Sequence, residues 1–153
     1  MAERAAGPAA SRPWSWNLRG TSAPVLVEVR RWASRALVLV DDTHLGDVLL
    51  VVTELVTNAY DHGRGPLEVR MDYAPGPCRV RIEVDDNSLD HPVLRVASPH
   101  GRRGRGMVLV DKLAAGWGVA ENRAAGGKTV WAEVTCDGAG AVRCAAAASR
   151  TAR

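Results

Sequence analysis

The sequence contains no phenylalanine, only three cysteines and no long hydrophobic run. Without phenylalanine, valine, leucine and five tryptophans must fill any core. The cysteines, Cys78, Cys136 and Cys144, are odd in number and form no Cys-x-x-Cys pair. They therefore argue against a disulfide framework or a zinc site, and they predict reduced thiols.

Signals for a membrane or for export are missing as well. The longest aliphatic run, at residues 48–52, is far too short to cross a bilayer. No apolar segment follows Arg4 and Arg12, as it would in a signal peptide. We therefore expect a cytoplasmic protein without membrane contact.

The excess of positive charge is small. The net charge is +3, and the basic residues, almost all arginines, are spread along the chain. No Lys/Arg-rich helix or interleaved aromatic patch stands out, so direct nucleic-acid binding is not expected.

The length of 153 residues suits one domain. Residues 1–13 are mostly Ala, Gly, Pro and Arg and have nothing to bury, so we expect a disordered N-terminus. Residues 137–153 are rich in Ala with scattered Arg and predict a flexible tail. The folded domain is then expected over residues 14–136.

The hydrophobic pattern predicts the elements of this domain. A short edge strand at 14–18 precedes a helix that Thr21 or Ser22 caps and that extends to about Val40. Residues 41–43 end this helix and cap a second one at 45–62. Alternating residues at 67–73 and 78–84 predict a hairpin, 107–115 a third helix, and 117–121 with 129–134 a second hairpin. This order predicts an α+β fold, a two-layer α/β sandwich whose mixed, mainly antiparallel sheet has helices on one face.

The second helix is apolar on two sides. One side faces the expected core, while Glu54, Asn58 and Asp61 share a polar strip on nearly the opposite side, together with Leu50 and Val51. A helix with two apolar sides is covered on both, which favours a bound ligand slightly over an ordinary solvent-facing strip with two stray aliphatic residues. An Asn amide oxygen suits Mg²⁺ that is also held by phosphates, and a carboxylate one turn away can accept a proton.

Three further segments carry candidate site residues. Asp86 ends a strand, where a carboxylate can accept the exocyclic amino group of adenine or can simply form an Asx-turn. Gly104-Arg-Gly106 opens a helix, so its backbone N–H groups can approach a phosphate, with Arg102, Arg103 and Arg105 adding charge. Thr129 ends the segment Gly126-Gly-Lys-Thr129 and can hydrogen-bond the adenine base or a bridging water, although this four-residue segment alone reads as a hairpin turn.

Taken together, residues 14–134 resemble the ATP-binding domain of the GHKL superfamily, and more narrowly its bacterial anti-sigma-factor serine kinase branch. The Glu-Leu-Val-Thr-Asn-Ala segment at residues 54–59 matches the N box of the family. The resemblance implies the Bergerat ATP-binding fold, with Glu54 as general base and Asn58 as the Mg²⁺ ligand. It implies that Asp86 reads adenine, that Thr129 is the threonine of the family's last motif, and that ATP and Mg²⁺ bind.

The second glycine box of the family matches Gly104, Arg105, Gly106, Met107 and Val108 and the two residues that follow. With Arg102, Arg103, Ser88, Asp61 and His62, these residues complete the expected nucleotide site.

The first glycine box departs from the family pattern. Asp-x-Gly-x-Gly is replaced by Asp-Asn-Ser-Leu-Asp at residues 86–90, where the Ser88 side chain can crowd the base. Asp85, next to Asp86, leaves open which carboxylate reads adenine. Residues 88–103 correspond to the ATP lid, which is short and lacks a catalytic lysine.

Two functions remain open. The first is a protein serine/threonine kinase that phosphorylates an anti-anti-sigma (STAS) partner, with a sigma factor as the other client. The alternative is a non-catalytic nucleotide-binding module that sequesters a sigma factor or another partner. The resemblance also implies a possible homodimer. A histidine-kinase fragment is disfavoured because only about twenty residues precede the first expected helix, too few for a phosphoacceptor helix pair.

Overall fold

The computed structural model describes residues 14–22, 25–38, 40–62, 64–75, 78–90, 92 and 105–135. The expected disordered N-terminus at 1–13 and the tail at 137–153 lie outside these residues. Among the described helices, none is long and apolar enough to span a membrane.

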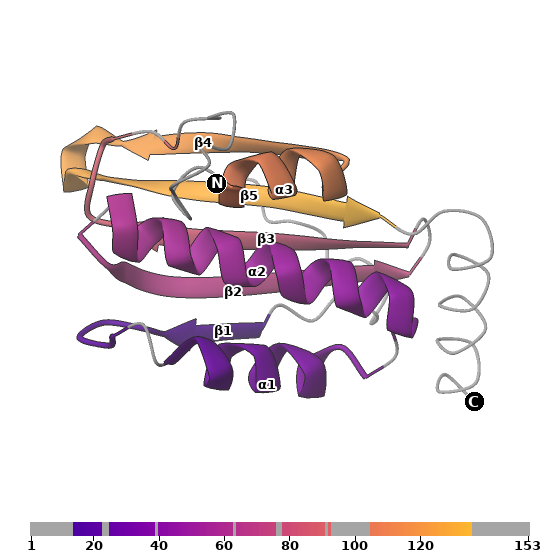
Figure 1. Cartoon of the computed structure of the whole chain (residues 1–153). Coiled ribbons are helices and arrows are strands. Elements are labelled where there is room, and N and C mark those ends of the chain that lie inside the picture. Colours follow the sequence, from indigo (N-terminus) through magenta and orange to yellow (C-terminus); the bar gives the residue numbers. More distant parts are fainter. Residues whose placement is uncertain are drawn as a thin grey trace, which may run out of the picture.

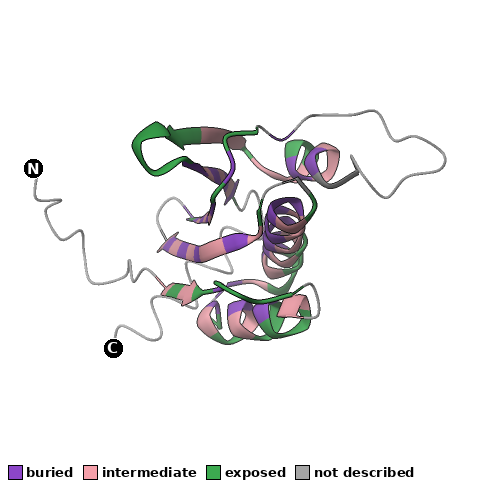
Figure 2. Cartoon of the chain, turned by 90° about the vertical axis from the view of Figure 1, so that its left-hand side faces the viewer, coloured by how far each residue is buried: buried purple, intermediate pink, exposed green. Residues whose placement is uncertain are grey.

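Five strands form one sheet, and three helices lie on the same side of it (Figures 1 and 2). The order across the sheet is β1-β2-β3-β5-β4, and each neighbouring pair is antiparallel. The strands are β1 (Trp14–Asn17), β2 (Pro66–Pro75), β3 (Cys78–Asp86), β4 (Gly116–Asn122) and β5 (Gly127–Thr135). The helices are α1 (Leu26–Ala36), α2 (Asp42–His62) and α3 (Arg105–Leu113), with a 3₁₀ turn at Arg123–Ala125 between β4 and β5. The predicted α+β sandwich is confirmed.

The core lies between the sheet and the helices. Alternate residues of β3 and β5 face the helices and are at most 1% exposed, namely Val80, Ile82, Val84, Val130, Ala132 and Val134. The predicted inner face of α2 meets them, with Val48, Val52, Leu55, Val56 and Ala59 also at most 1% exposed. Burying small branched side chains on both layers gives a continuous core without phenylalanine.

The ends of α1 differ from the prediction. Its N-cap is Val25, without a side-chain hydrogen bond, and the Thr21 hydroxyl instead donates to the Leu18 carbonyl. The helix stops at Ala36, because the following Leu37 leaves the helical region (φ −99°, ψ 38°). The cap of α2 is as predicted, since Asp41 Oδ2 accepts the Thr43 N–H at 3.2 Å.

Cys78 starts β3 and is the one cysteine among the described residues. It is disulfide-bonded, so the prediction of reduced thiols is wrong for Cys78. Strand pairing brings distant segments close to Cys78, since the adjacent Arg79 lies opposite Thr135 of β5. Sequence spacing does not reveal this proximity.

Candidate functional site

The polar strip of α2 is only partly open to solvent. Asn58 is 8% exposed, Glu54 is intermediate and Asp61 is exposed. Partial burial raises the pKa of the Glu54 carboxyl, and the negative charge of Asp61 raises it further. A carboxylate with a raised pKa accepts a proton more readily near neutral pH, so Glu54 has the character that a general base needs.

The second apolar side of α2 is covered at least in part by the chain itself. Val51, on the same strip as Asn58, is fully buried, whereas Leu50 is 44% exposed. Besides β2, β3 and β5, the helix α2 contacts both α1 and α3. Burial of this strip therefore does not by itself require a ligand, and evidence for one must come from unsatisfied polar groups.

Asp86 provides that evidence at the end of β3. Its side chain lies on the helix-covered face of the sheet and is 2% exposed. Asp86 pairs with Pro66 of β2, and only three residues separate Pro66 from the last residue of α2. The Gly65 N–H also bonds back to the Ala59 carbonyl at 3.0 Å. The C-terminal part of α2, which carries Asn58, therefore lies at the same end of the sheet as Asp86.

The two oxygens of the Asp86 carboxylate have different environments. Oδ1 accepts the Ser88 N–H at 2.8 Å, which forms an Asx-turn, and the Lys128 ammonium at 2.9 Å. Oδ2 is buried and has no protein partner among the described residues. A buried acceptor without a partner is costly unless a donor reaches it. An exocyclic amino group of a nucleobase is a donor of this kind, so the site fits adenine.

Lys128 and Gly127 are two neighbours of Asp86 to which sequence reasoning gave no role. Lys128 is 3% exposed and forms a buried ion pair with Asp86. A Cβ atom on Gly127 would lie 2.4 Å from the Asp86 carbonyl oxygen, so only glycine lets β5 approach the end of β3 this closely. A signal for Lys128 was present, because strand alternation places it on the same face as the buried Val130 and Ala132.

Asp85 and Thr129 face the opposite side of the sheet. Partial burial alone would raise the pKa of Asp85, but hydrogen bonds from Arg70 and Thr129 hold it below its usual value. The expectation that Thr129 hydrogen-bonds the base read by Asp86 is not met by the structure, because adjacent strand residues point to opposite faces and the Thr129 hydroxyl donates to Asp85. Asp86 is thus the carboxylate on the helix side.

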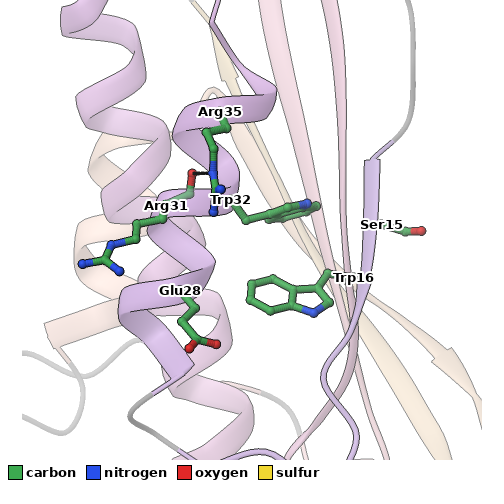
Figure 3. A pocket seen from close by; sticks show the side chains of 6 residues that line it. All are labelled: Ser15, Trp16, Glu28, Arg31, Trp32 and Arg35. Atoms are coloured by element: carbon green, nitrogen blue, oxygen red, sulfur yellow. Dashed lines mark hydrogen bonds between the residues drawn. The ribbon is translucent and has the colours of Figure 1, made fainter.

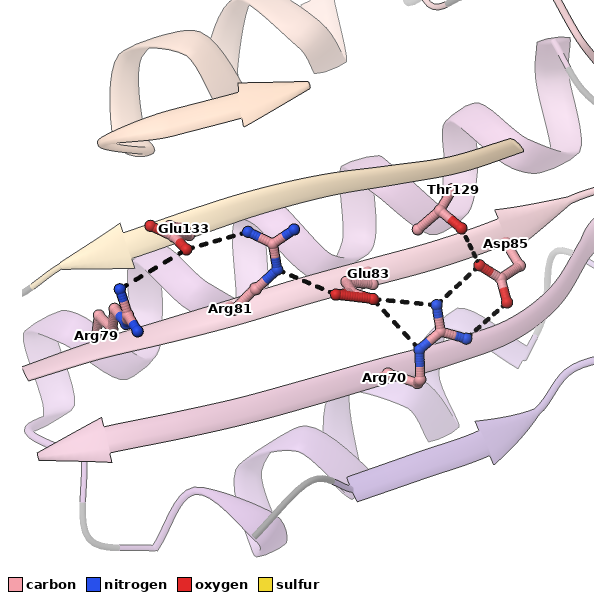
Figure 4. A network of polar contacts seen from close by, with 7 residues as sticks. All are labelled: Arg70, Arg79, Arg81, Glu83, Asp85, Thr129 and Glu133. Carbon is pink, nitrogen blue, oxygen red and sulfur yellow. Dashed lines mark hydrogen bonds and ion pairs between the residues drawn. The ribbon is translucent and has the colours of Figure 1, made fainter. Parts of the chain in front are cut away.

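The open face of the sheet is held together by ion pairs (Figure 4). Arg70 donates to both oxygens of Asp85, at 2.6 and 2.9 Å, and to Glu83 at 3.1 Å. The network comprises Arg70, Arg79, Arg81, Glu83, Asp85, Thr129 and Glu133. Its charges are balanced between neighbours, so it stabilises strand pairing.

The remaining expected residues are placed only in part. Met107 is 3% exposed and Val108 is intermediate on α3, which packs against α2. Ser88 is 9% exposed, and its hydroxyl accepts the Asp90 N–H at 3.1 Å. Arg102, Arg103 and Gly104 lie outside the described residues, as do the side chains of His62 and Arg105; Gly106 has described backbone only.

A complete protein metal site is not formed by the described residues. No group of three or more His, Cys, Asp or Glu side chains comes together among them. Any Mg²⁺ at Asn58 would therefore need oxygen ligands from a bound nucleotide and water, as Mg²⁺ at phosphate sites commonly has.

A separate pocket of about 410 Å³ lies between β1 and α1, away from Asp86 (Figure 3). Trp16 and Trp32 line it with ring centroids 5.8 Å apart. The α1 side of the pocket carries both the negative Glu28 and the positive Arg31 and Arg35. The lining therefore does not favour a ligand of one charge. It gathers none of the expected site residues.

Comparison with known proteins gives one result. A search of curated proteins found no match. The family described as the histidine kinase-like ATPase domain matches residues 20–134, a range that includes α2, Asp86, α3 and Lys128. Because this match covers most of the 153 residues, the chain belongs to the histidine kinase-like ATPase domain family.

Proposed function

We propose that the protein binds ATP with Mg²⁺ and is a serine/threonine kinase of the anti-sigma-factor type. Its substrate would be a serine or threonine of an anti-anti-sigma (STAS) protein. The observation that carries the proposal is the buried Oδ2 of Asp86, which has no hydrogen-bond partner among the described residues, at the end of the sheet where α2 places Asn58. Membership of an ATPase domain family supports it.

The proposed binding mode follows from the donors and acceptors present. The exocyclic amino group of adenine donates to Asp86 Oδ2, whereas guanine would place a carbonyl oxygen against the same acceptor. The Asn58 amide oxygen would hold Mg²⁺, which would offset the negative charge of the phosphates. ATP should therefore bind more tightly than GTP.

The proposed transfer uses Glu54 as the base. The hydroxyl oxygen of the partner attacks the γ-phosphorus, the bond from that phosphorus to the β–γ bridging oxygen breaks, and ADP leaves. Glu54 accepts the hydroxyl proton. Its raised pKa, caused by partial burial and by Asp61, suits this role at neutral pH.

The alternative is a nucleotide-binding module that sequesters a sigma factor without catalysis. The sequence at 86–90 supports it, because no glycine follows Asp86 and the buried Ser88 side chain occupies part of the space near the base. Transfer activity separates the two functions.

The deciding experiment is Glu54→Gln, with the exposed Glu28→Gln as the matched control. ATP affinity is measured by calorimetry, and transfer from γ-labelled ATP is measured on a co-purified STAS protein. Glu54→Gln should keep near-normal ATP and partner binding while transfer falls by about 10²-fold or more, since general-base help appears only in the transition state. Glu28→Gln should leave both unchanged.

Asn58→Ala should impair ATP binding and transfer together, because it removes the proposed metal ligand. Transfer by Glu54→Gln at the unmutated rate would refute the base assignment. ATP binding without transfer to any co-purified partner would replace the kinase with the sequestering module.

A further inference from the structure

We propose that Lys128 is a positioning residue for base recognition, which holds Asp86 so that Oδ2 alone faces the exocyclic amino group of the nucleobase. The inference rests on the proposed binding of an adenine nucleotide. It assigns a role to a residue that the sequence motifs do not include.

The geometry separates the two carboxylate oxygens of Asp86. Lys128 Nζ lies 2.9 Å from Oδ1 and 3.1 Å from the Ser88 carbonyl oxygen, and the Ser88 N–H lies 2.8 Å from the same Oδ1. Oδ1 therefore accepts two hydrogen bonds, and Oδ2 accepts none from the described residues. The second hydrogen bond of Lys128, to the Ser88 carbonyl oxygen, also fixes its ammonium on the Oδ1 side.

Stability alone does not account for this arrangement. Both side chains are only 1% exposed, and replacing a buried ion pair by apolar side chains is often neutral or stabilising. A pair that served the fold alone would also satisfy both carboxylate oxygens, because an unmet buried acceptor is costly. The unmet oxygen of Asp86 instead leaves a defined position for a donor from outside the protein.

Lys128 also changes how the base is selected. The positive charge of Lys128 offsets the negative charge of Asp86. Recognition therefore depends on a directed hydrogen bond to Oδ2 rather than on net negative charge at the site. Loss of the 6-amino group from the ligand should then weaken binding by roughly 10- to 100-fold, as expected for a hydrogen bond to a charged group.

The test compares ATP with purine riboside triphosphate, which lacks only the 6-amino group. Dissociation constants are measured by calorimetry for the unmutated protein, Lys128→Met and Lys112→Met. Lys112, exposed on α3, is the only other lysine of the chain and provides the matched control. The unmutated protein and Lys112→Met should discriminate between the two ligands by the factor above. Lys128→Met should bind both ligands with nearly equal affinity, because Asp86 is no longer held in one orientation.

Equal weakening of both ligands in Lys128→Met, with the ratio preserved, would show a merely structural role and overturn the inference alone. Failure of ATP to bind the unmutated protein would overturn the inference and the proposed function together.

A measurement on the unmutated protein covers the case in which Lys128→Met does not fold. Two lysines give two side-chain ammonium signals when the protein is labelled with ¹⁵N at Nζ, and Lys112→Met assigns them. The Lys128 signal should shift more with ATP than with the analogue that lacks the amino group. An identical response to both ligands would overturn the inference.

Discussion

Replacing Gly127 with alanine is the sharpest test of how the site is built. Gly127 starts β5, and the next residue, Lys128, lies opposite Asp86. An added Cβ would lie 2.4 Å from the Asp86 carbonyl oxygen and 3.5 Å from the Asn87 Cα. Gly127 is not among the described glycines with positive φ, so alanine can adopt its backbone conformation. The cost of Gly127→Ala therefore comes from the contact itself.

The size of the effect follows from the distance. Ordinary contacts of a Cβ atom begin near 3.4 Å, so the two backbone segments must separate by about 1 Å. Neither segment is a flexible side-chain end, and the Lys128–Asp86 hydrogen bond at 2.9 Å joins them directly. Overpacking of this kind costs about 1–3 kcal/mol, and weakening a buried ion pair adds to it. We expect a loss of at least about 2 kcal/mol, or roughly 8 °C in Tm.

The assay is thermal and urea unfolding followed by circular dichroism, with two glycine controls. Gly46, on α2, has no atom within 4 Å of an added Cβ, so Gly46→Ala should stabilise the helix by about 1 kcal/mol. Gly126 also has open space but a φ of +70°, so Gly126→Ala should cost about 1–2 kcal/mol through strain alone. A Gly127→Ala protein within about 0.5 kcal/mol of the unmutated one would refute the close approach of β5 to β3.

Three further outcomes are expected. The pKa of Glu54 is raised in the folded protein, so ionisation of this carboxyl lowers the free energy of unfolding as the pH rises through that pKa. Glu54→Gln should therefore be more stable than the unmutated protein at pH 8, by roughly half a kcal/mol, and should show no gain at pH 3. Despite partial burial, arginine partners lower the pKa values of Glu83 and Asp85, so the contribution of these two carboxylates to stability should be constant above pH 5. It should fall as acid titrates the folded carboxylates below their ordinary values of 4.5 and 3.8, and a loss of this contribution that begins above pH 6 would contradict the reasoning. Gly118→Ala would place a Cβ 2.9 Å from the Trp131 ring, so the ring must move. We expect a change in tryptophan fluorescence and a loss of about 1–3 kcal/mol in the free energy of unfolding. An unchanged spectrum would count against the contact between Gly118 and Trp131.

Periodic patterns predicted most of the fold. The alternation of residues in β2, β3 and β5 and the apolar face of α2 follow directly from backbone geometry, so they are visible in a single sequence. The ends of elements were less predictable. Thr21 has the side chain of a helix cap, yet its hydroxyl contacts Leu18 and Tyr60 because the chain turns before α1 begins.

The candidate site was predictable where motif residues lie close together in the chain. Glu54 and Asn58 are one helical turn apart, so the helix alone places them side by side. Thr129 was expected at the base but lies on the other face from Asp86, because a shift of one residue along a strand reverses the side-chain direction. The same rule identifies Lys128 as the β5 residue that meets Asp86.

The sequence by itself determined the class of fold, the buried face of α2 and the presence of an N-box helix, because each depends on neighbours within a few residues. Only the tertiary structure decided that Cys78 is disulfide-bonded, that Asp85 faces the open side, and that Lys128 binds one oxygen of Asp86 and not the other. Asp86 and Lys128 are 42 residues apart, and their contact exists because β5 inserts between β3 and β4 in the sheet. Strand order and register are set by the packing of the whole core, so no local pattern could reveal which side chains meet at Asp86.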